Sequence, residues 1–141
     1  MRERNLREAF TLIELLIVLA IIGALMAIGI PIYTTSLQNA NAMTVASNMR
    51  TIADAIRTKL TMEGTVSSTN PPANEFIKTK DADDYTINIT GPSNQKYTVT
   101  ITYTGNRAPA SKIKDKLDGC ATADVDNNDH AYCEIDVPVA F

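Results

Sequence analysis

Glu14, near the start of the apolar run Phe10 to Ile32, is the one charged side chain in that run, and its charge needs to be compensated. The eighteen residues from Leu15 to Ile32 carry no charge, which is long enough for a membrane-spanning helix. A carboxylate at that depth costs at least about 2.5 kcal/mol, so it either reaches the headgroups or has a partner. No Lys or Arg occurs from Leu15 to Met49, but cleavage before Phe10 would create a positive α-amine.

A second group of candidate ligands lies near the C-terminus. Asp124, Asp126 and Asn128 occupy alternate positions, as the first oxygen ligands of a calcium loop do. The sixth position of such a loop is Asp129 instead of Gly, and the twelfth is Ile135 instead of Glu. Asp and Asn are equally typical of an exposed turn. We therefore predict a turn here, with calcium as the alternative and no other cofactor.

The remaining reactive side chains do not form an enzyme site. His130 is the single histidine, and no nucleophile–base arrangement or phosphate-binding glycine loop accompanies it. Cys120 and Cys133 bound a fourteen-residue loop without a CxxC motif, and one histidine is too few for a zinc set. Outside the cytoplasm these two cysteines are expected to form a disulfide, which would stabilise the fold by about 3 kcal/mol.

A single long helix is predicted over residues 10–62, with 10–32 as its transmembrane part. Past the apolar run, apolar side chains recur at steps of three or four residues and polar side chains fall between them. The apolar positions are Val45, Met49, Ile52, Ile56 and Leu60. This second half is therefore amphipathic and can supply the core of a globular domain. On its polar side, Arg50 and Asp54 have the spacing of an i,i+4 ion pair.

Gly23, Gly29 and Pro31 weaken the predicted helix within its apolar half. Proline removes a backbone hydrogen bond and clashes with the preceding turn, and glycine is a poor helix former. Two interpretations stay open. Either the proline is simply tolerated in a membrane helix, or the segment from Gly23 to Pro31 is a functionally weakened part of the helix that can lose its helical hydrogen bonds.

The rest of the chain, residues 63–141, is long enough for one small globular head. Alternating apolar and polar residues predict strands at Tyr85–Thr90 and Lys96–Thr104, joined by a five-residue turn at 91–95. A helical turn is expected at Ser111–Leu117, and a further strand at Tyr132–Phe141. The apolar face of the hairpin is expected to pack on the amphipathic half of the long helix.

The first nine residues, MRERNLREA, differ in character from the apolar run after them. They contain three Arg and two Glu, and the positive charges favour a cytoplasmic N-terminus. Without them the chain has ten basic and fourteen acidic side chains, which argues against a broad nucleic-acid-binding surface.

The run Ala9-Phe10-Thr11-Leu12-Ile13-Glu14, between this basic segment and the long apolar helix, resembles the N-terminal signature of type IV prepilins and type II secretion pseudopilins. The resemblance implies that residues 1–9 are a leader, which prepilin peptidase removes between Ala9 and Phe10. The new amine of Phe10 would be N-methylated. Ala9 departs from the usual Gly at that position. The implied fold is α+β and pilin-like, with a long N-terminal helix packed on a small antiparallel sheet.

The resemblance also implies a structural role, that of a major pilin in a type IV pilus. The precursor would cross the inner membrane once, and an assembly platform with minor pilins would transfer it into an extracellular homo-oligomeric filament. Glu14 would pair with the amine of Phe10 on a neighbouring subunit, and the segment from Gly23 to Pro31 would melt. A pseudopilin and a signal-anchored protein that never polymerises are the alternatives. The sequence does not distinguish adhesion, motility and DNA uptake.

Overall fold

The computed structural model describes residues 10–65 and 68–139, and it divides into two compact units, one up to Leu37 and one from Gln38 onward. The predicted leader, including Ala9, lies outside the described residues. The elements follow in the order α1 (Leu12–Glu63), η1 (Ala73–Glu75), η2 (Ala82–Asp84), β1 (Tyr85–Ser93), β2 (Lys96–Tyr103), α2 (Ala110–Lys116), β3 (Thr122–Val125) and β4 (Ala131–Pro138).

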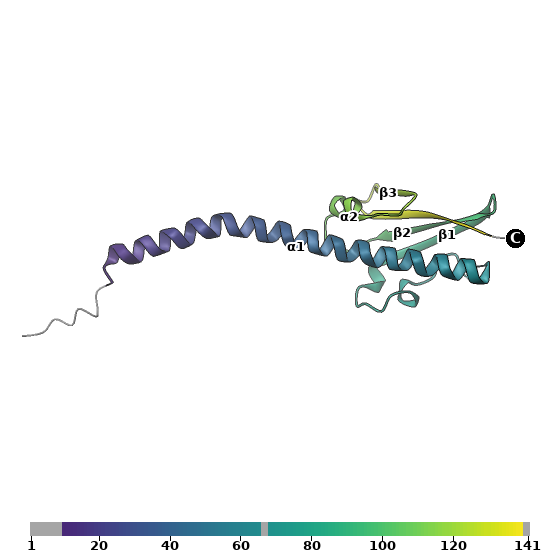
Figure 1. Ribbon diagram of the computed structural model, residues 1–141, viewed down its shortest axis with the longest axis horizontal. Helices are drawn as coiled ribbons and strands as arrows, with labels where there is room; N and C mark the ends of the chain where they lie inside the picture. Colours follow the sequence, from purple (N-terminus) through teal and green to yellow (C-terminus); the bar gives the residue numbers. More distant parts are fainter. Residues whose placement is uncertain (1–9, 66–67, 140–141) are drawn as a thin grey trace, which may run out of the picture. The chain divides into compact units, whose positions relative to one another are not determined.

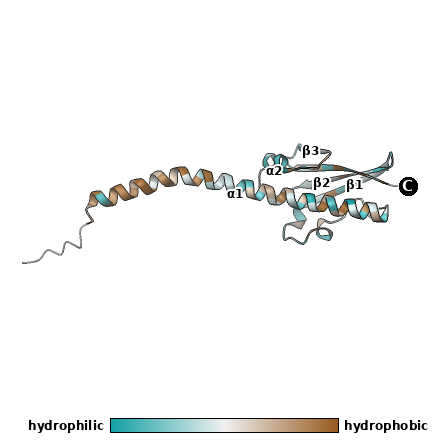
Figure 2. Cartoon of the chain, in the orientation of Figure 1, coloured by the Kyte–Doolittle hydropathy of each residue, from teal (hydrophilic) through white to brown (hydrophobic). Residues whose placement is uncertain are grey.

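The first unit contains the N-terminal part of α1, whose side chains are all exposed from Phe10 onward. Figure 2 shows the ribbon of this part coloured mostly as hydrophobic residues. Among the described residues, α1 is the one helix that is long and apolar enough to cross a membrane. Exposed apolar side chains around a whole helix are stable in lipid or against other helices, but not in water. The predicted hydrophobic N-terminal helix is therefore confirmed.

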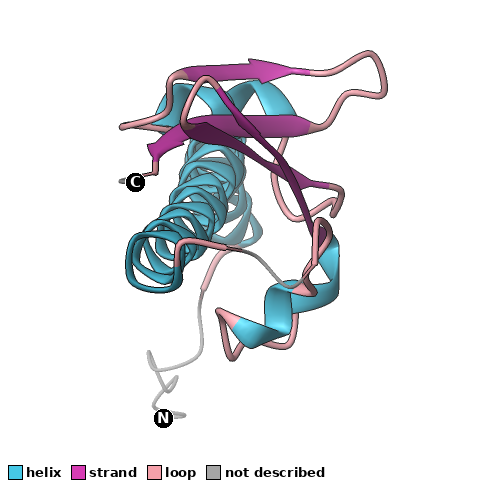
Figure 3. Ribbon diagram, turned by 90° about the vertical axis from the view of Figure 1, so that its right-hand side faces the viewer, coloured by secondary structure: helices cyan, strands magenta, loops and turns pink. Residues whose placement is uncertain are grey.

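The second unit is built around a four-stranded antiparallel sheet with strand order β1-β2-β4-β3. Its register aligns Ile87 with Ile101 and Ile101 with Cys133, so that apolar side chains form rows across three strands. The sheet lies along the C-terminal part of α1 (Figures 1 and 3). This arrangement confirms the α+β, pilin-like architecture.

The core of the head is where α1 meets one face of the sheet. The stripe predicted on α1 is fully buried, because each of its five side chains is at most 1% exposed. Alternate residues of β1, β2 and β4 face it, as period-2 burial requires. No charged side chain is buried among the residues that the structure describes. The core includes Val45, Met49, Ile52, Ile56, Leu60, Tyr85, Ile87, Ile89, Tyr97, Val99, Ile101, Tyr103, Ile113, Cys133, Ile135 and Val137.

The hairpin is confirmed, but its predicted five-residue turn is wrong. β1 continues to Ser93, and Asn94 and Gln95 alone form the turn, both with positive φ, of 53° and 63°. Two consecutive positive φ values give the turn whose twist matches the flanking strands, and Asn tolerates this conformation well. The extra residues are taken up by an irregularity in the pairing between Thr90 and Ser93.

Two further differences come from tertiary contacts. The loop between the cysteines contains a short strand, β3, which is stabilised by pairing with β4 and has no strong pattern of its own. The predicted Arg50–Asp54 ion pair is wrong, because Asp54 pairs with Arg57 at 3.3 Å and Arg50 reaches Asp118 at 3.8 Å. These ion pairs are solvent-exposed and contribute little to stability.

Candidate functional site

The N-terminus of α1 is closed by a reciprocal pair of hydrogen bonds between Thr11 and Glu14. The Thr11 N–H donates to the Glu14 carboxylate, and the Glu14 N–H donates to Thr11 Oγ1, each at 3.3 Å. This is a capping box, which satisfies two backbone donors that a helix start otherwise leaves free. The positive end of the helix dipole also favours a carboxylate here.

The capping box explains how Glu14 can be tolerated beside an apolar segment in a membrane. A carboxylate that accepts a backbone N–H in the first helical turn is partly stabilised before any second subunit arrives. The box also holds Glu14 close to the peptide bond that links Phe10 to Thr11. A free amine at Phe10 would therefore lie within reach of the same carboxylate. Thr11 is not among the site residues predicted from the sequence, although the Thr-x-x-Glu pattern before an apolar run indicates a helix cap at this threonine.

The predicted weak point of α1 is helical in this structure. α1 passes through Pro31, and both Thr34 Oγ1 and Thr35 Oγ1 donate to the Pro31 carbonyl oxygen, at 3.0 and 2.9 Å. Hydroxyls that bond back to the preceding turn weaken and bend helices. An added Cβ at Gly23 or Gly29 would meet nothing within 4 Å, so neither glycine is needed for packing within the chain.

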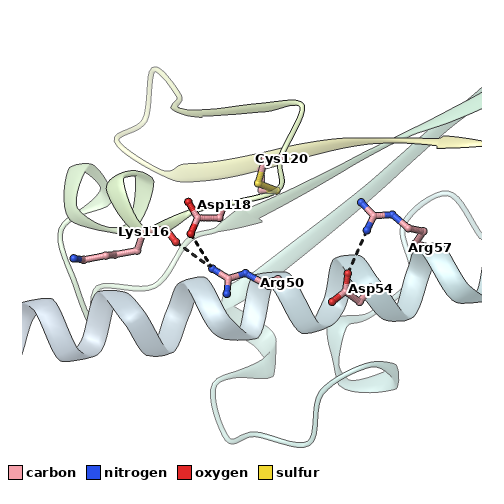
Figure 4. The surroundings of a disulfide bond; sticks show 7 residues. Arg50, Asp54, Arg57, Lys116, Asp118 and Cys120 are labelled. Carbon is pink, nitrogen blue, oxygen red and sulfur yellow. Dashed lines mark hydrogen bonds and ion pairs between the residues drawn. A yellow bond between two sulfur atoms is a disulfide. The ribbon is translucent and has the colours of Figure 1, made fainter.

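Cys120 and Cys133 form the predicted disulfide, with a Cα–Cα separation of 5.6 Å. Cys133 lies on β4 and is 3% exposed, facing the core. Cys120 follows α2 in a segment that Arg50 contacts from α1 through the carbonyl oxygen of Lys116 at 3.4 Å (Figure 4). The bond therefore joins the central part of the sheet to the segment that lies over α1.

The candidate calcium residues form a turn whose carboxylates bind backbone and lysine groups. Asp126 Oδ1 accepts the N–H groups of Asn128 and His130, each at 2.9 Å. Asp124 Oδ1 accepts the N–H of Val125 at 2.8 Å and lies 3.1 Å from Lys114 Nζ. No group of three or more His, Cys, Asp or Glu side chains that could hold a metal ion is found among the described residues. Calcium at Asp124, Asp126 and Asn128 stays a prediction.

These contacts change the acidity of the two carboxyl groups in the same direction. The Val125 N–H, followed by Lys114, lowers the pKa of Asp124 below its ordinary 3.8. The His130 N–H lowers the pKa of Asp126 in the same way, because a donor stabilises the charged form. Both groups are therefore anionic at neutral pH, and backbone amides satisfy part of their charge.

The head also contains a pair of tyrosines that were expected only as strand residues. Tyr85 and Tyr103 are cross-strand neighbours whose ring centroids lie 5.1 Å apart. Asn48 on α1 donates to the Tyr85 hydroxyl at 3.0 Å, and the Arg107 N–H donates to that of Tyr103 at 3.2 Å. Burial raises the pKa of both phenols above the ordinary 10.0. The pair links helix, sheet and the β2–α2 loop.

The ends of the chain therefore carry different features. The N-terminal part has a helix capped by its own glutamate and an unburied apolar surface. The head has a complete core, a disulfide and exposed charges, some of which form ion pairs. Among the described residues no constellation for catalysis is found, and one large surface, on α1, must be covered by lipid or protein.

Comparison with known proteins agrees with this division. Residues 4–30 match a family described as the prokaryotic N-terminal methylation motif, which is typical of type IV pilins and pseudopilins. No solved structure matches the chain significantly. The match covers most of the predicted leader, the predicted cleavage position, Glu14 and most of the apolar part of α1. Such a motif implies processing by prepilin peptidase and assembly into a filament.

The motif at the N-terminus, the hydrophobic helix that follows it and the antiparallel sheet packed on its C-terminal part point to one conclusion. The chain carries the N-terminal methylation motif that is typical of type IV pilins and pseudopilins, on a pilin-like α+β fold.

Proposed function

We propose that the chain is the major subunit of a type IV pilus, an extracellular filament that serves adhesion, motility or DNA uptake. The observation that carries this proposal is the contrast between the two parts of α1. Its N-terminal part exposes every side chain from Phe10 onward, whereas its C-terminal part is buried in a complete head. A chain of this kind needs lipid as a precursor and other copies of α1 after assembly.

The energetic demand on assembly is large. Burying one large aliphatic side chain contributes about 1.5–3 kcal/mol, so the exposed run from Leu12 to Ile32 represents on the order of tens of kcal/mol. That surface cannot pass through water, and must move directly from the inner membrane into packed helices. An assembly platform with minor pilins would perform this transfer. Gly23 and Gly29, which touch nothing within the chain, can admit neighbouring helices closely.

Glu14 has a defined place in the proposal. Cleavage between Ala9 and Phe10 would give Phe10 an amine, which methylation leaves positively charged. In the free precursor, Glu14 is held by Thr11 through the capping box. In the filament core it would pair instead with the Phe10 amine of a neighbouring subunit, because an unpaired charge in a dry helix bundle is strongly destabilising. This pairing would set the axial register between subunits.

Mass spectrometry of the mature N-terminus tests the processing step. The expected product begins at Phe10, carries one methyl group on its amine and lacks residues 1–9. A chain that keeps its leader in cells with an active prepilin peptidase would contradict the proposal and favour a simple membrane anchor. Ala9→Gly, which restores the residue usual before the cut, should be processed at least as fast as the natural chain.

Filament assembly tests the role of Glu14. Glu14→Gln keeps the shape of the side chain and removes its charge, so filament yield on cells should fall sharply while precursor levels stay unchanged. Glu63→Gln is the matched control, since Glu63 is an exposed acid at the other end of α1. Equal filament yield for Glu14→Gln and the natural chain would refute the intersubunit pair.

The alternative function is that of a pseudopilin in a type II secretion system. Both subunits would share the segment from Phe10 to Ile32, so this segment does not distinguish them. Deletion of the gene separates the two. Loss of surface filaments with normal protein secretion supports the pilus, and loss of secretion without any surface filament supports the pseudopilus.

A further inference from the structure

The sheet of the head has two outer edges, β1 and β3, and the chain itself covers the first. An open edge presents unpaired N–H and C=O groups to which a strand of another molecule can add. The Ile89 N–H points away from β2 and donates to the Thr69 carbonyl oxygen at 2.7 Å. The Asn70 amide lies 3.1 Å from the Ile87 carbonyl oxygen, and we assign its nitrogen to this position because only the nitrogen can donate to a carbonyl. The segment at 69–70 therefore blocks strand addition at β1.

The edge at β3 has no covering segment of this kind among the described residues, but one of its donors is already used. The Asp126 N–H donates to the His130 carbonyl oxygen of the neighbouring chain segment at 2.9 Å. Because amides alternate in direction along a strand, those of Asp124 and Thr122 also face β4. The amides of Ala123 and Val125 consequently face outward. The Val125 N–H donates to Asp124 Oδ1 at 2.8 Å. A side chain of the strand itself thus occupies one of the two outward amides of β3.

The carboxylate that does this is held from a second element. Lys114 on α2 places its Nζ 3.1 Å from the same Asp124 Oδ1, and both side chains are about half exposed. The lysine charge therefore lies beside the edge and holds the carboxylate next to the backbone of β3. Charged side chains at an edge also disfavour strand addition, because an added strand would remove water from them.

We propose that Asp124 closes the outer edge of β3 against strand addition by β3 of a second copy of the chain, and that Lys114 is its positioning residue. A second copy is the relevant partner because antiparallel pairing of β3 with itself is self-complementary about a two-fold axis. A subunit that gathers at high local density needs this protection more than a dilute protein does. The edge belongs to the head alone, so its closure serves a pilin and a pseudopilin equally.

The first test measures backbone hydrogen exchange of the full chain in detergent micelles, with the Val125 amide as the readout. Asp124→Ala should speed exchange at Val125 several-fold, because it removes the acceptor. Asp124→Asn keeps a carbonyl oxygen and should restore most of the protection, and Lys114→Met should fall between them. Asp136→Ala is the matched control, since Asp136 on β4 is also paired with a lysine, Lys96 on β2. Unchanged Val125 exchange in Asp124→Ala would overturn the proposal.

The second test measures strand addition directly. A photo-cross-linking amino acid replaces Thr122, an exposed residue of β3, in natural and Asp124→Ala backgrounds. Dimer yield should rise several-fold with Asp124→Ala as protein concentration increases, and it should stay at the natural level in the Asp136→Ala background. An intact Cys120–Cys133 disulfide, read by mass spectrometry, shows that each variant has folded. Equal dimer yields in all backgrounds would refute the edge-closing role.

Calcium provides a third, independent arm of the test. If Asp124 closes the edge, added Ca²⁺ or a chelator leaves Val125 exchange in the natural chain unchanged. If Ca²⁺ slows exchange at Val125 and at Asn128 together, the carboxylate is a calcium ligand. That result would overturn the edge-closing proposal in favour of a metal loop.

Discussion

Cutting the disulfide should destabilise the head by an amount that the loop length fixes. The bond joins residues thirteen apart in sequence, and closing a loop of that size stabilises a fold by about 3 kcal/mol through the entropy of the unfolded chain. Cys120→Ala removes the bond while the Cys133 side chain still fills its place in the core. With a urea m-value of about 1–1.5 kcal/mol/M for a domain of this size, the midpoint should fall by roughly 2–3 M.

Urea unfolding of the full chain in non-ionic detergent, followed by tyrosine fluorescence, measures this shift, because the chain contains no tryptophan. Reduction of the natural chain should reproduce the effect of Cys120→Ala. Cys133→Ala should cost about 1 kcal/mol more, since it also leaves a small cavity beneath β4. A loss below about 1 kcal/mol for Cys120→Ala would refute the loop-entropy reasoning. It would also indicate that the loop between the cysteines stays ordered in the unfolded state.

Three further predictions concern the head. Burial raises the pKa of Tyr85 and Tyr103 above 10.0, so their contribution to stability is present below about pH 10 and is lost as the pH rises through the raised pKa. In Tyr103→Phe, the melting temperature should therefore fall less steeply with alkaline pH than in the natural chain. The Lys96 hydrogen bond lowers the pKa of Asp136 below 3.8, so its contribution is present above about pH 3.8 and lost in more acid solution; the difference in melting temperature between natural chain and Asp136→Asn should vanish there. The Ile52 side chain is 0% exposed, so Ile52→Ala should lower the free energy of unfolding by about 2–5 kcal/mol and Ile52→Val by about 0.5–1.5 kcal/mol, as measured by urea unfolding. Equal losses for both variants would show that the site relaxes around the cavity.

The long helix and the hairpin could be predicted because their signals are local. The stripe on α1 repeats every three or four residues, and the strands alternate every two, so each pattern specifies both an element and its buried face. The disulfide was also predictable, since the chain has only two cysteines. The predicted processing position and the predicted role of Glu14 come from a short N-terminal motif that does not depend on the fold at all.

The errors occur where a residue's partner is distant in sequence. Arg50 could pair with Asp54 by spacing, but the segment after α2 brings Asp118 and a carbonyl oxygen to it instead. β3 has few residues and a mixed pattern, so only its pairing with β4 makes it a strand. The two-residue turn at Asn94 depends on how β1 and β2 align, which the sequence of the turn alone does not specify.

The sequence by itself determined the two-part character of this protein. Local hydrophobic periodicity, an acid after a basic N-terminal segment and two cysteines suffice to predict an apolar helix, a small head and a disulfide. Tertiary structure decided how side chains are used. It placed Asn48 of the long helix against Tyr85 of the sheet, and Lys114 of α2 against Asp124 of β3. The physical reason is that burial patterns are read along one chain, whereas hydrogen bonds and ion pairs are chosen among all groups that folding brings within about 3 Å.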